Sequence, residues 1–264
     1  MKIVVFTPTY RPGGLDVLEA SLMRQTFKDF VWVVSDQRFI NRYPIWGEIQ
    51  SRVDFPIQWM QREIPEGNKR NLCAMYNNVA EFVLDKGFDM LVSLQDYIYL
   101  HPDGLQRFID ANKLFPDSLL TGVTHISRDP YPNKIVDLEG DYTIFNEPFT
   151  SRPRRLSWED VRVSQLYVLG DEILPVETGH WEANWAAIPR KILEAGVRWD
   201  EELDKGIAYE NMDFAQQAKL KGFNVVLDKS NIAISLPHKD YFEGEREEII
   251  EFSNRDYYES KWTQ

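Results

Sequence analysis

Two aspartates that end short apolar runs are the residues best suited to hold a cation. Asp36 follows the run 30–34, and Asp96 follows the run 91–94. Each run predicts a buried strand that ends near the acid. If both strands belong to one parallel sheet, both carboxylates lie at its carboxyl edge, where open α/β sheets bind ligands. A carboxylate there can bind a hard cation or a nucleotide, or it can simply cap the next turn.

One histidine also follows an expected strand. The run 232–234 predicts that strand, and His238 comes soon after it. With Asp96 it would give one nitrogen and one oxygen ligand, a pair that suits Mn²⁺ or Mg²⁺ once phosphate oxygens complete the shell. A lone histidine is more often structural, so this is a hypothesis. Cys73 is the single cysteine, so neither a zinc cluster nor an intramolecular disulfide is expected.

Two expected helices open with charged side chains. Arg70 lies at the start of 69–84, where a cation opposes the helix dipole. It is therefore either solvated or placed to meet a phosphate. Glu210 and Asp213 lie in the first turn of 210–220, where the dipole keeps a carboxylate ionised, as a general base requires. Acids are favoured at that position anyway, so a purely structural role stays open.

The elements that must position these residues follow the order of a parallel sheet. Runs 2–6 and 30–34 flank a helical pattern at 15–23, which gives a strand-helix-strand unit. Residues 125–180 are rich in proline and aromatic residues and have poor periodicity. We interpret them as an elaborated loop region over a site, with a second domain as the alternative. The basic cluster Arg152, Arg154 and Arg155 would serve that region as a lid or acceptor surface.

Composition narrows the class of protein. The chain has 264 residues, of which 43% are hydrophobic, which is enough for a sizeable core. A net charge of −12 disfavours nucleic acid and anionic membranes, and it means that a diphosphate site needs a cation or placed basic residues. No run is long enough for an integral membrane segment, and residues 1–6 are too short an apolar run for a signal peptide. We expect a cytoplasmic protein.

Several motifs, taken in order, resemble the inverting family-two glycosyltransferases with the GT-A fold. They are Val5-Phe6-Thr7-Pro8-Thr9-Tyr10-Arg11, the Leu22 to Phe30 segment with Gln25-Thr26, Gly67 to Asn71 with Arg70, Gln95-Asp96, Trp199-Asp200-Glu201, and Glu210-Asn211. The resemblance covers most of the chain outside 125–180. It implies a single α/β domain over 1–264 with a mixed, mainly parallel Rossmann-like sheet flanked by helices and an acceptor-side insertion. The implied parts are a nucleotide-binding half (1–115), an acceptor-binding half (116–242) and a C-terminal tail (243–264).

The resemblance also implies roles for individual residues. The nucleotide, a uridine or other pyrimidine diphosphate, would be contacted by Thr9, Tyr10, Asp36, Arg70 and Asp96. Asp96 would bind the metal with His238 as a further ligand, and Glu210 to Asp213 would face the acceptor. Two departures matter. Gln95 and Tyr97 stand where carboxylates are often found, and Asn211 replaces the usual base. An amide cannot take a proton, so Glu210 is the first candidate base and Asp213 the second.

The expected reaction moves a sugar from a nucleotide-diphosphate sugar, UDP-linked by the resemblance, to a hydroxyl of a glycan or other acceptor, with inversion and metal assistance. Aromatic faces pack against sugar rings, so we expect His180, Trp181, Glu182 and Trp185 to line the sugar or acceptor site. The tryptophans could equally be core anchors. Two alternatives remain. A nucleotidyltransferase would need a Gly-rich basic loop, which residues 9–14 match poorly, and an inactive sugar-nucleotide- or glycan-binding protein would explain Asn211.

Overall fold

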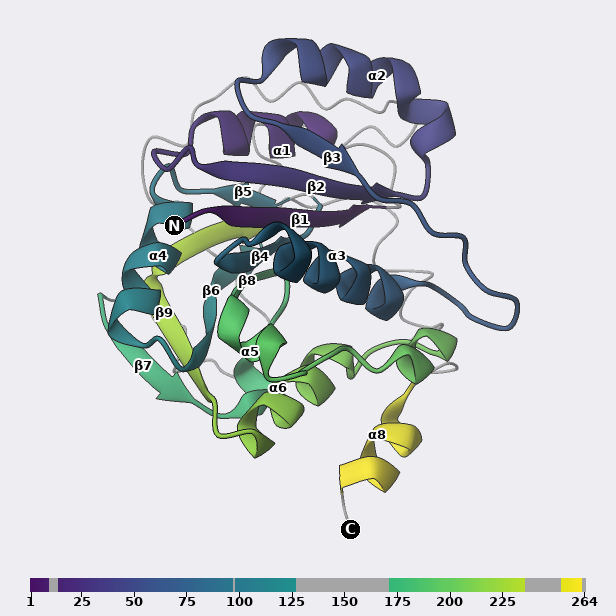
Figure 1. The fold of residues 1–264 in the computed structure, drawn as a ribbon, viewed down its shortest axis with the longest axis vertical. Coiled ribbons are helices and arrows are strands. Elements are labelled where there is room, and N and C mark those ends of the chain that lie inside the picture. The colour runs from purple at the N-terminus through teal and green to yellow at the C-terminus, as the bar shows by residue number, and fades with distance from the viewer. Residues whose placement is uncertain (10–13, 97, 127–170, 236–252, 263–264) are drawn as a thin grey trace.

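The computed structural model describes residues 1–9, 14–96, 98–126, 171–235 and 253–262 (Figure 1). Within them, nine strands form one sheet in the order β3-β2-β1-β4-β8-β6-β9-β5, and β7 pairs with β9. The strands are β1 (Ile3–Thr9), β2 (Phe30–Asp36), β3 (Ile57–Trp59), β4 (Met90–Leu94), β5 (Ile98–Leu100), β6 (Ser118–Ile126), β7 (Ile173–Val176), β8 (Trp185–Pro189) and β9 (Asn224–Ser235).

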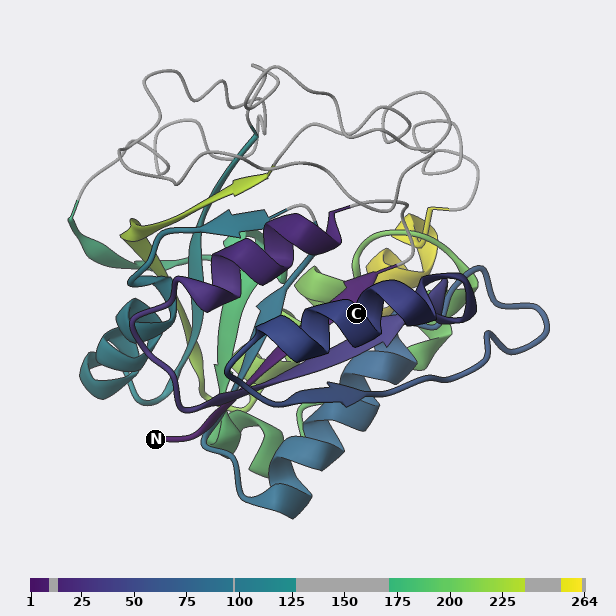
Figure 2. The same ribbon diagram turned by 90° about the horizontal axis from the view of Figure 1, so that it is seen from above.

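The helices connect the strands and cover both faces of the sheet (Figures 1 and 2). They are α1 (Leu15–Met23), α2 (Phe39–Arg52), α3 (Leu72–Lys86), α4 (Gly104–Leu114), α5 (Arg190–Glu194), α6 (Glu210–Leu220) and α8 (Arg255–Trp262), with short 3₁₀ turns η1 (Thr178–His180) and η2 (Glu201–Lys205).

Strand direction confirms the predicted fold class. The ladders place β1, β2, β3, β4, β6 and β9 in one direction and β5, β7 and β8 in the other. In the described residues the sheet is therefore mixed and mainly parallel, with helices on both sides. The four strands of its parallel half, β3-β2-β1-β4, have their carboxyl ends at the same edge of the sheet. The chemically interesting strand-end residues gather there.

Burial on both faces explains why the first strand is a continuous apolar run. Ile3 and Val5 belong to one buried cluster, whereas Val4 and Phe6 belong to another on the opposite face. Successive side chains of a strand point to opposite faces, so a central strand covered on both sides needs apolar residues at every position. Helices α1, α2 and α4 contribute to the first cluster, and α3, α5 and α6 contribute to the second.

Helix α2 lies in a stretch whose pattern is hard to interpret from sequence. Pro44 and Gly47 both fall inside it, and both disfavour a helix interior. Packing offsets that cost, because Trp46 and Ile49 are buried and the Trp46 ring lies 5.5 Å from that of Trp32 in β2. The helix is thus decided by tertiary contacts.

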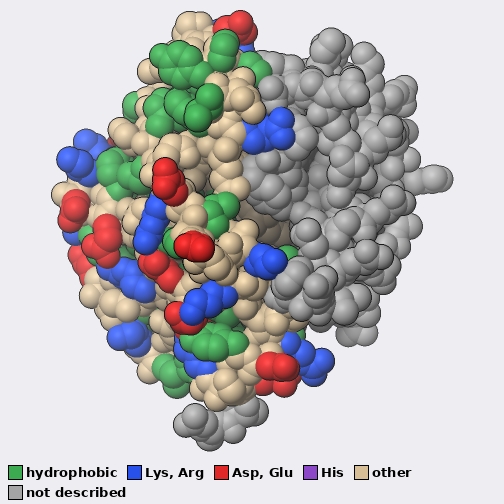
Figure 3. Space-filling model, turned by 90° about the vertical axis from the view of Figure 1, so that its right-hand side faces the viewer, with side chains coloured by type: hydrophobic (Ala, Val, Ile, Leu, Met, Phe, Trp, Pro, Cys, Tyr) green, Lys and Arg blue, Asp and Glu red, His purple; other side chains and the backbone are tan. Residues whose placement is uncertain are grey.

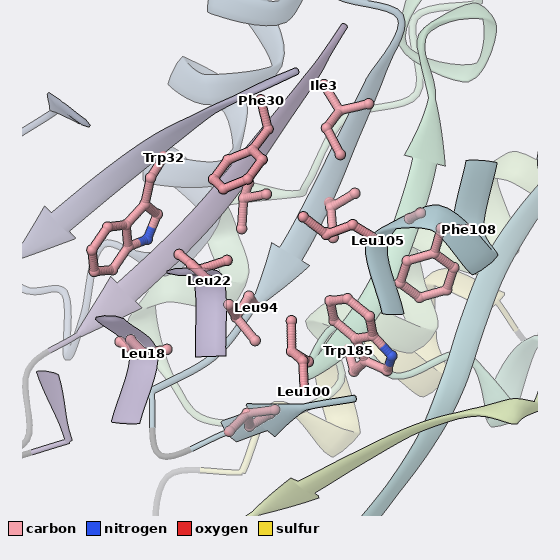
Figure 4. Packing of buried hydrophobic residues seen from close by; sticks show 14 of the residues in the cluster. Ile3, Leu18, Leu22, Phe30, Trp32, Leu94, Leu100, Leu105, Phe108 and Trp185 are labelled. Atoms are coloured by element: carbon pink, nitrogen blue, oxygen red, sulfur yellow. The ribbon is translucent and has the colours of Figure 1, made fainter. Parts of the chain in front are cut away.

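Trp185 fills the space between β6 and α4 in one core (Figure 4). Its ring lies 4.5 Å from that of Phe108, and its indole Nε1 donates to Asn231 Oδ1 at 3.1 Å. A Cβ atom on Gly122 would lie 2.2 Å from Trp185 Cδ1 and 2.5 Å from the Asn231 carbonyl oxygen. Only a residue without a side chain fits at position 122.

Gly122→Ala is therefore expected to destabilise the protein by about 3 kcal/mol, because neither the tryptophan ring nor the backbone can move away cheaply. Thermal unfolding should show a Tm about 9 °C lower. Gly47→Ala is the matched control, since nothing lies within 4 Å of a Cβ there. That change should stabilise α2 by about 0.5–1 kcal/mol. An unaltered Tm in Gly122→Ala would contradict the packing described.

Candidate functional site

The carboxyl edge of the parallel half brings three predicted residues together. Thr9 ends β1 and stands opposite Asp36 at the end of β2. Asp96 follows β4, on the other side of β1. The Thr9 hydroxyl donates to Asp96 Oδ2 at 3.2 Å, and Asp96 is 5% exposed. The two acids that sequence places on one edge thus flank one hydroxyl.

Asp36 is held from α2 by two side chains that sequence reasoning missed. Trp46 Nε1 donates to Asp36 Oδ2 at 2.7 Å, and Arg42 Nη1 lies 3.4 Å from Asp36 Oδ1 and 3.4 Å from Thr9 Oγ1. The Arg38 backbone N–H adds a bond of 2.8 Å. Arg42 and Asp36 are both buried, and a buried charge requires such a partner. Asp36 therefore anchors α2 to the strand ends.

Arg70 and Glu210 meet where the N-termini of α3 and α6 converge. Arg70 Nη2 lies 2.8 Å from Glu210 Oε2, although the two residues are 140 positions apart. The Arg70 side chain is 21% exposed and that of Glu210 11%. Arg70 Nε also lies 3.9 Å from Asp204 Oδ1. A candidate phosphate ligand and a candidate base thus form one partly exposed ion pair.

Asp204, which sequence reasoning did not select, organises the segment that carries Arg70. Its carboxylate accepts the backbone N–H groups of Cys73 and Ala74 at 2.9 and 3.0 Å. Its carbonyl accepts those of Lys69 and Arg70 at 3.0 and 3.2 Å. Burial raises the pKa of Asp204, although these N–H donors and Arg70 oppose the shift. It caps α3 from outside the helix, so no local sequence signal could reveal it.

The turn before α6 is strained. Ala208 and Tyr209 have φ values of 69° and 70°, in the left-handed region that non-glycine residues avoid. Each such residue costs on the order of 1–3 kcal/mol and persists only where the surroundings hold it, which happens most often at functional sites. Glu210 directly follows Tyr209, so the strained backbone adjoins the candidate base.

Glu182 approaches the same edge from the turn before β8. Asn211 Nδ2 donates to Glu182 Oε2 at 3.5 Å, and the Gln95 N–H donates to the Asn184 carbonyl at 3.1 Å. The second bond ties this turn to the one that carries Asp96. His180 lies close by in sequence, in η1, and both side chains are partly buried. Glu182 and Asn211 therefore lie at the same edge of the sheet as Asp96.

Trp181 and Trp185 are buried in the core, with no exposed surface. The Trp181 ring stacks with that of Phe214 at 5.3 Å, and its indole N–H donates to the Leu120 carbonyl at 3.3 Å. Trp185 packs as described above. A covered ring cannot stack on a sugar, so the expectation that both line the sugar site is corrected, and the core-anchor alternative describes them.

Asp213 points away from Glu210 toward the C-terminal helix. It is 1% exposed, and it accepts from Gln217 Nε2 at 2.7 Å and from Trp262 Nε1 at 2.8 Å. Lys261 Nζ lies 2.8 Å from it. Because both its oxygens are bonded inside the protein, it is less suited than Glu210 to meet an acceptor hydroxyl.

Other predicted positions lie outside the described residues: Tyr10, Tyr97, Arg152, Arg154, Arg155 and His238. Among the described residues, no group of three or more His, Cys, Asp or Glu side chains is arranged to hold a metal. Asp96 still fits a cation that arrives with its substrate, because Mg²⁺ and similar ions use one or two carboxylates plus substrate phosphates.

The surface does not present a uniform charge. On the face shown in Figure 3, hydrophobic side chains gather at the end where α2 lies, and acidic and basic side chains are interspersed below it. A net charge of −12 is therefore compatible with local positive groups such as Arg70. No helix in the described part of the chain has the length and apolar character needed to cross a membrane.

Solved structures with the same fold include two glycosyltransferases. S. aureus TarS 1–349 in complex with UDP-GlcNAc matches with a TM-score of 0.58 and 13% identity, over 90% of this chain and 59% of that one. GalNAc-T7 with UDP, GalNAc and Mn²⁺ matches with a TM-score of 0.59 and 11% identity, over 92% and 45%. No family model and no curated protein matches the sequence.

These similarities establish a GT-A-like fold. A further structure of S. aureus TarS 1–349 matches with a TM-score of 0.56 and 14% identity, over 89% of this chain and 60% of that one. The chain thus spans about three fifths of that structure. At such low identity the likeness concerns architecture, and the chemistry must be argued from the residues themselves.

Proposed function

We propose that this protein transfers a sugar from a nucleotide-diphosphate sugar, UDP-linked, to a hydroxyl group of a glycan or similar acceptor, with inversion and with help from a divalent metal. The ion pair between Arg70 and Glu210 at the carboxyl edge carries the proposal. In this pair the proposed phosphate-binding cation lies against the proposed proton acceptor, with Asp96 at the same edge. The neighbours solved with UDP, UDP-GlcNAc and Mn²⁺ support the choice of donor and metal.

Asp96 and Thr9 form the metal side of the site. Asp96 would hold Mn²⁺ or Mg²⁺, with His238 proposed as a further ligand, and the bound ion would stabilise the charge that develops on the leaving diphosphate. The Thr9 hydroxyl donates to Asp96 Oδ2, and this bond fixes the carboxylate's orientation. Oriented ligands reduce the reorganisation needed when the donor binds.

Arg70 supplies the positive charge that an acidic protein needs for a diphosphate. Asp204 already occupies the backbone N–H groups of Cys73 and Ala74, so the α3 N-terminus offers few donors of its own. The guanidinium has five N–H donors and can bind a phosphate in a forked arrangement. Its present partner, Glu210, would then be exchanged for the diphosphate.

That exchange would release Glu210 for catalysis. An acceptor hydroxyl oxygen forms a bond to the anomeric carbon, and its proton passes to the Glu210 carboxylate. The bond from the anomeric carbon to the diphosphate breaks on the opposite side, and the diphosphate leaves with the electron pair. Asn211 and Glu182 would orient the acceptor through their hydrogen bond. The departure of the nucleotide diphosphate would return Arg70 to Glu210.

One alternative keeps the ligand and drops the reaction. Asn211 stands where the resembling family has an acid, and Glu210 is engaged by Arg70. A sugar-nucleotide-binding protein without turnover would use the same edge. It would bind UDP but would not turn over a UDP-sugar, whichever acceptor is added.

Binding tests the proposal first. UDP at 100 times its Kd should stabilise the wild type by about 2.7 kcal/mol, since it binds only the folded state, and Mn²⁺ should increase the shift in Tm. Arg70→Met should weaken UDP binding about 10- to 100-fold, the range of one charge-assisted hydrogen bond. Thermal shift and calorimetry with UDP, with and without Mn²⁺, measure both effects.

Arg198→Met is the matched control. Arg198 pairs with Glu81 at 2.7 Å, and Glu81 lies in the second half of α3, well beyond the first turn that Arg70 precedes. Its removal should leave UDP affinity unchanged. The proposed function would be refuted if the wild type bound no UDP under any condition. Equal UDP affinities in the wild type and Arg70→Met would refute the role of Arg70.

A further inference from the structure

The C-terminal helix α8 bridges the two elements on either side of the strained turn. Lys261 Nζ lies 2.6 Å from Asp200 Oδ2, at the start of η2, and 2.8 Å from Asp213 Oδ1 in α6. Trp262 Nε1 donates to Asp213 Oδ1 at 2.8 Å, and the Tyr257 hydroxyl donates to Asp200 Oδ2 at 2.8 Å. Figure 1 shows α8 beside this segment and away from the sheet.

The contacts of α8 with Asp200 and Asp213 are charged and largely shielded from water. Asp213 is 1% exposed and the Lys261 side chain 28%. Burial alone would raise the pKa of Asp200, but Lys261 and Tyr257 hold it below its ordinary value. Burial alone would likewise lower the pKa of Lys261, but Asp200 and Asp213 raise it. A buried carboxylate such as Asp213 would be costly without these donors.

Residues just before α8 hold the turn itself. Asn254 Nδ2 donates to the carbonyls of Leu203 and Ala208 at 2.8 and 3.1 Å, and the Asn254 N–H donates to the Ile207 carbonyl at 3.0 Å. The rings of Tyr209 and Tyr258 lie 5.1 Å apart. The two left-handed residues, Ala208 and Tyr209, are thus contacted from the C-terminal segment.

We propose that α8 is a positioning element for Glu210, and that Lys261 is its central residue, acting through Asp200 and Asp213. Glu210 follows the strained turn directly, so the direction of its carboxylate depends on how that turn is held. The inference rests on the proposed function in taking Glu210 as the base. Without the contacts of α8 with Asp200 and Asp213, the turn would relax and the Glu210 carboxylate would no longer be held in position. The donor site at Thr9 and Asp96 would stay intact.

The test separates positioning from binding. Lys261→Met keeps most of the side-chain length and removes the charge, and Lys261→Arg restores the charge. We expect Lys261→Met to lower kcat for UDP-sugar turnover about 100-fold, the loss typical of a misplaced catalytic group. The KM for the donor and the Kd for UDP should rise by no more than about twofold, because Thr9 and Asp96 are untouched and Arg70 keeps its contact with Asp204. Lys261→Arg should recover most of kcat.

Arg255→Met is the matched control, since Arg255 pairs with Glu259 on the exposed side of α8. It should behave as wild type. Trp262→Phe is a second variant for the case in which Lys261→Met folds poorly. It keeps an aromatic ring but loses the indole N–H that donates to Asp213, and it should lower kcat about 10-fold. Amide hydrogen exchange at residues 206–213 gives a readout independent of activity, and it should be faster in Lys261→Met.

Unchanged exchange at 206–213 in Lys261→Met would overturn the inference whatever the activity. So would parallel losses of kcat and UDP affinity, which indicate general destabilisation. Faster exchange in Lys261→Met, together with a wild type that fails to bind UDP, would overturn the proposed function and leave the contact between α8 and the turn standing.

Discussion

Glu210→Gln is expected to lower kcat for sugar transfer about 1000-fold, within the range that a general base contributes. The amide keeps the shape of the side chain but cannot accept the acceptor's proton. Its oxygen can still accept a hydrogen bond from Arg70, whose Nη2 lies 2.8 Å from Glu210 Oε2. UDP affinity should not fall, because a neutral amide competes with the diphosphate for Arg70 less strongly than the carboxylate does.

Steady-state rates with a UDP-sugar and a panel of hydroxyl acceptors measure this effect. Glu202→Gln is the matched control, because Glu202 is exposed and pairs with Lys205 at 2.6 Å on η2. Full activity in Glu210→Gln would remove Glu210 as the base.

Asp96→Asn is expected to lower kcat/KM for the donor about 100-fold or more and to abolish the Mn²⁺-dependent part of UDP stabilisation. With Gln95 and Tyr97 on either side, Asp96 is the sole carboxylate of its motif. An amide oxygen is a weaker ligand for a hard cation than a carboxylate. The Thr9 hydroxyl can still donate to the amide oxygen, so the fold should tolerate the change.

Chelation provides the companion measurement. EDTA should reduce the wild-type rate to about the level of Asp96→Asn and should have little further effect on that variant. Asp110→Asn is the control, since Asp110 lies exposed on α4 and pairs with Lys113 at 2.8 Å. If wild type and Asp96→Asn respond equally to Mn²⁺, the metal does not bind at Asp96.

Local patterns were enough to predict the strands that build the site. The apolar run of β1 and the run of β4 are buried on both faces, which is the condition that produces such runs. Strand ends in a parallel sheet share one edge, so the approach of Asp36 and Asp96 to Thr9 followed from the order of elements. Periodicity also predicted both helices: α6 begins at Glu210 as expected, whereas α3 begins at Leu72, two residues after Arg70.

Other features depended on contacts between residues far apart in the sequence. Asp204 caps α3 from 131 positions away, and Arg42 pairs with Asp36 from a helix whose own sequence disfavours it. Trp181 and Trp185 were expected either to line the sugar site or to anchor the core, because residue type cannot tell a buried ring from an exposed one. Residues 243–264 were expected only as a C-terminal tail, whereas their end, α8, bonds to Asp200 and Asp213.

The physical reason for this division is range. Backbone propensity and hydrophobic periodicity act over a few residues, so the sequence by itself determined strands such as β1, β2 and β4, most helices and the residue types at their ends. Burial and ion pairing depend on which elements pack together, and that is settled only when the whole core forms. The pairing of Arg70 with Glu210, and the hold of α8 on the turn before Glu210, were decided by the tertiary structure.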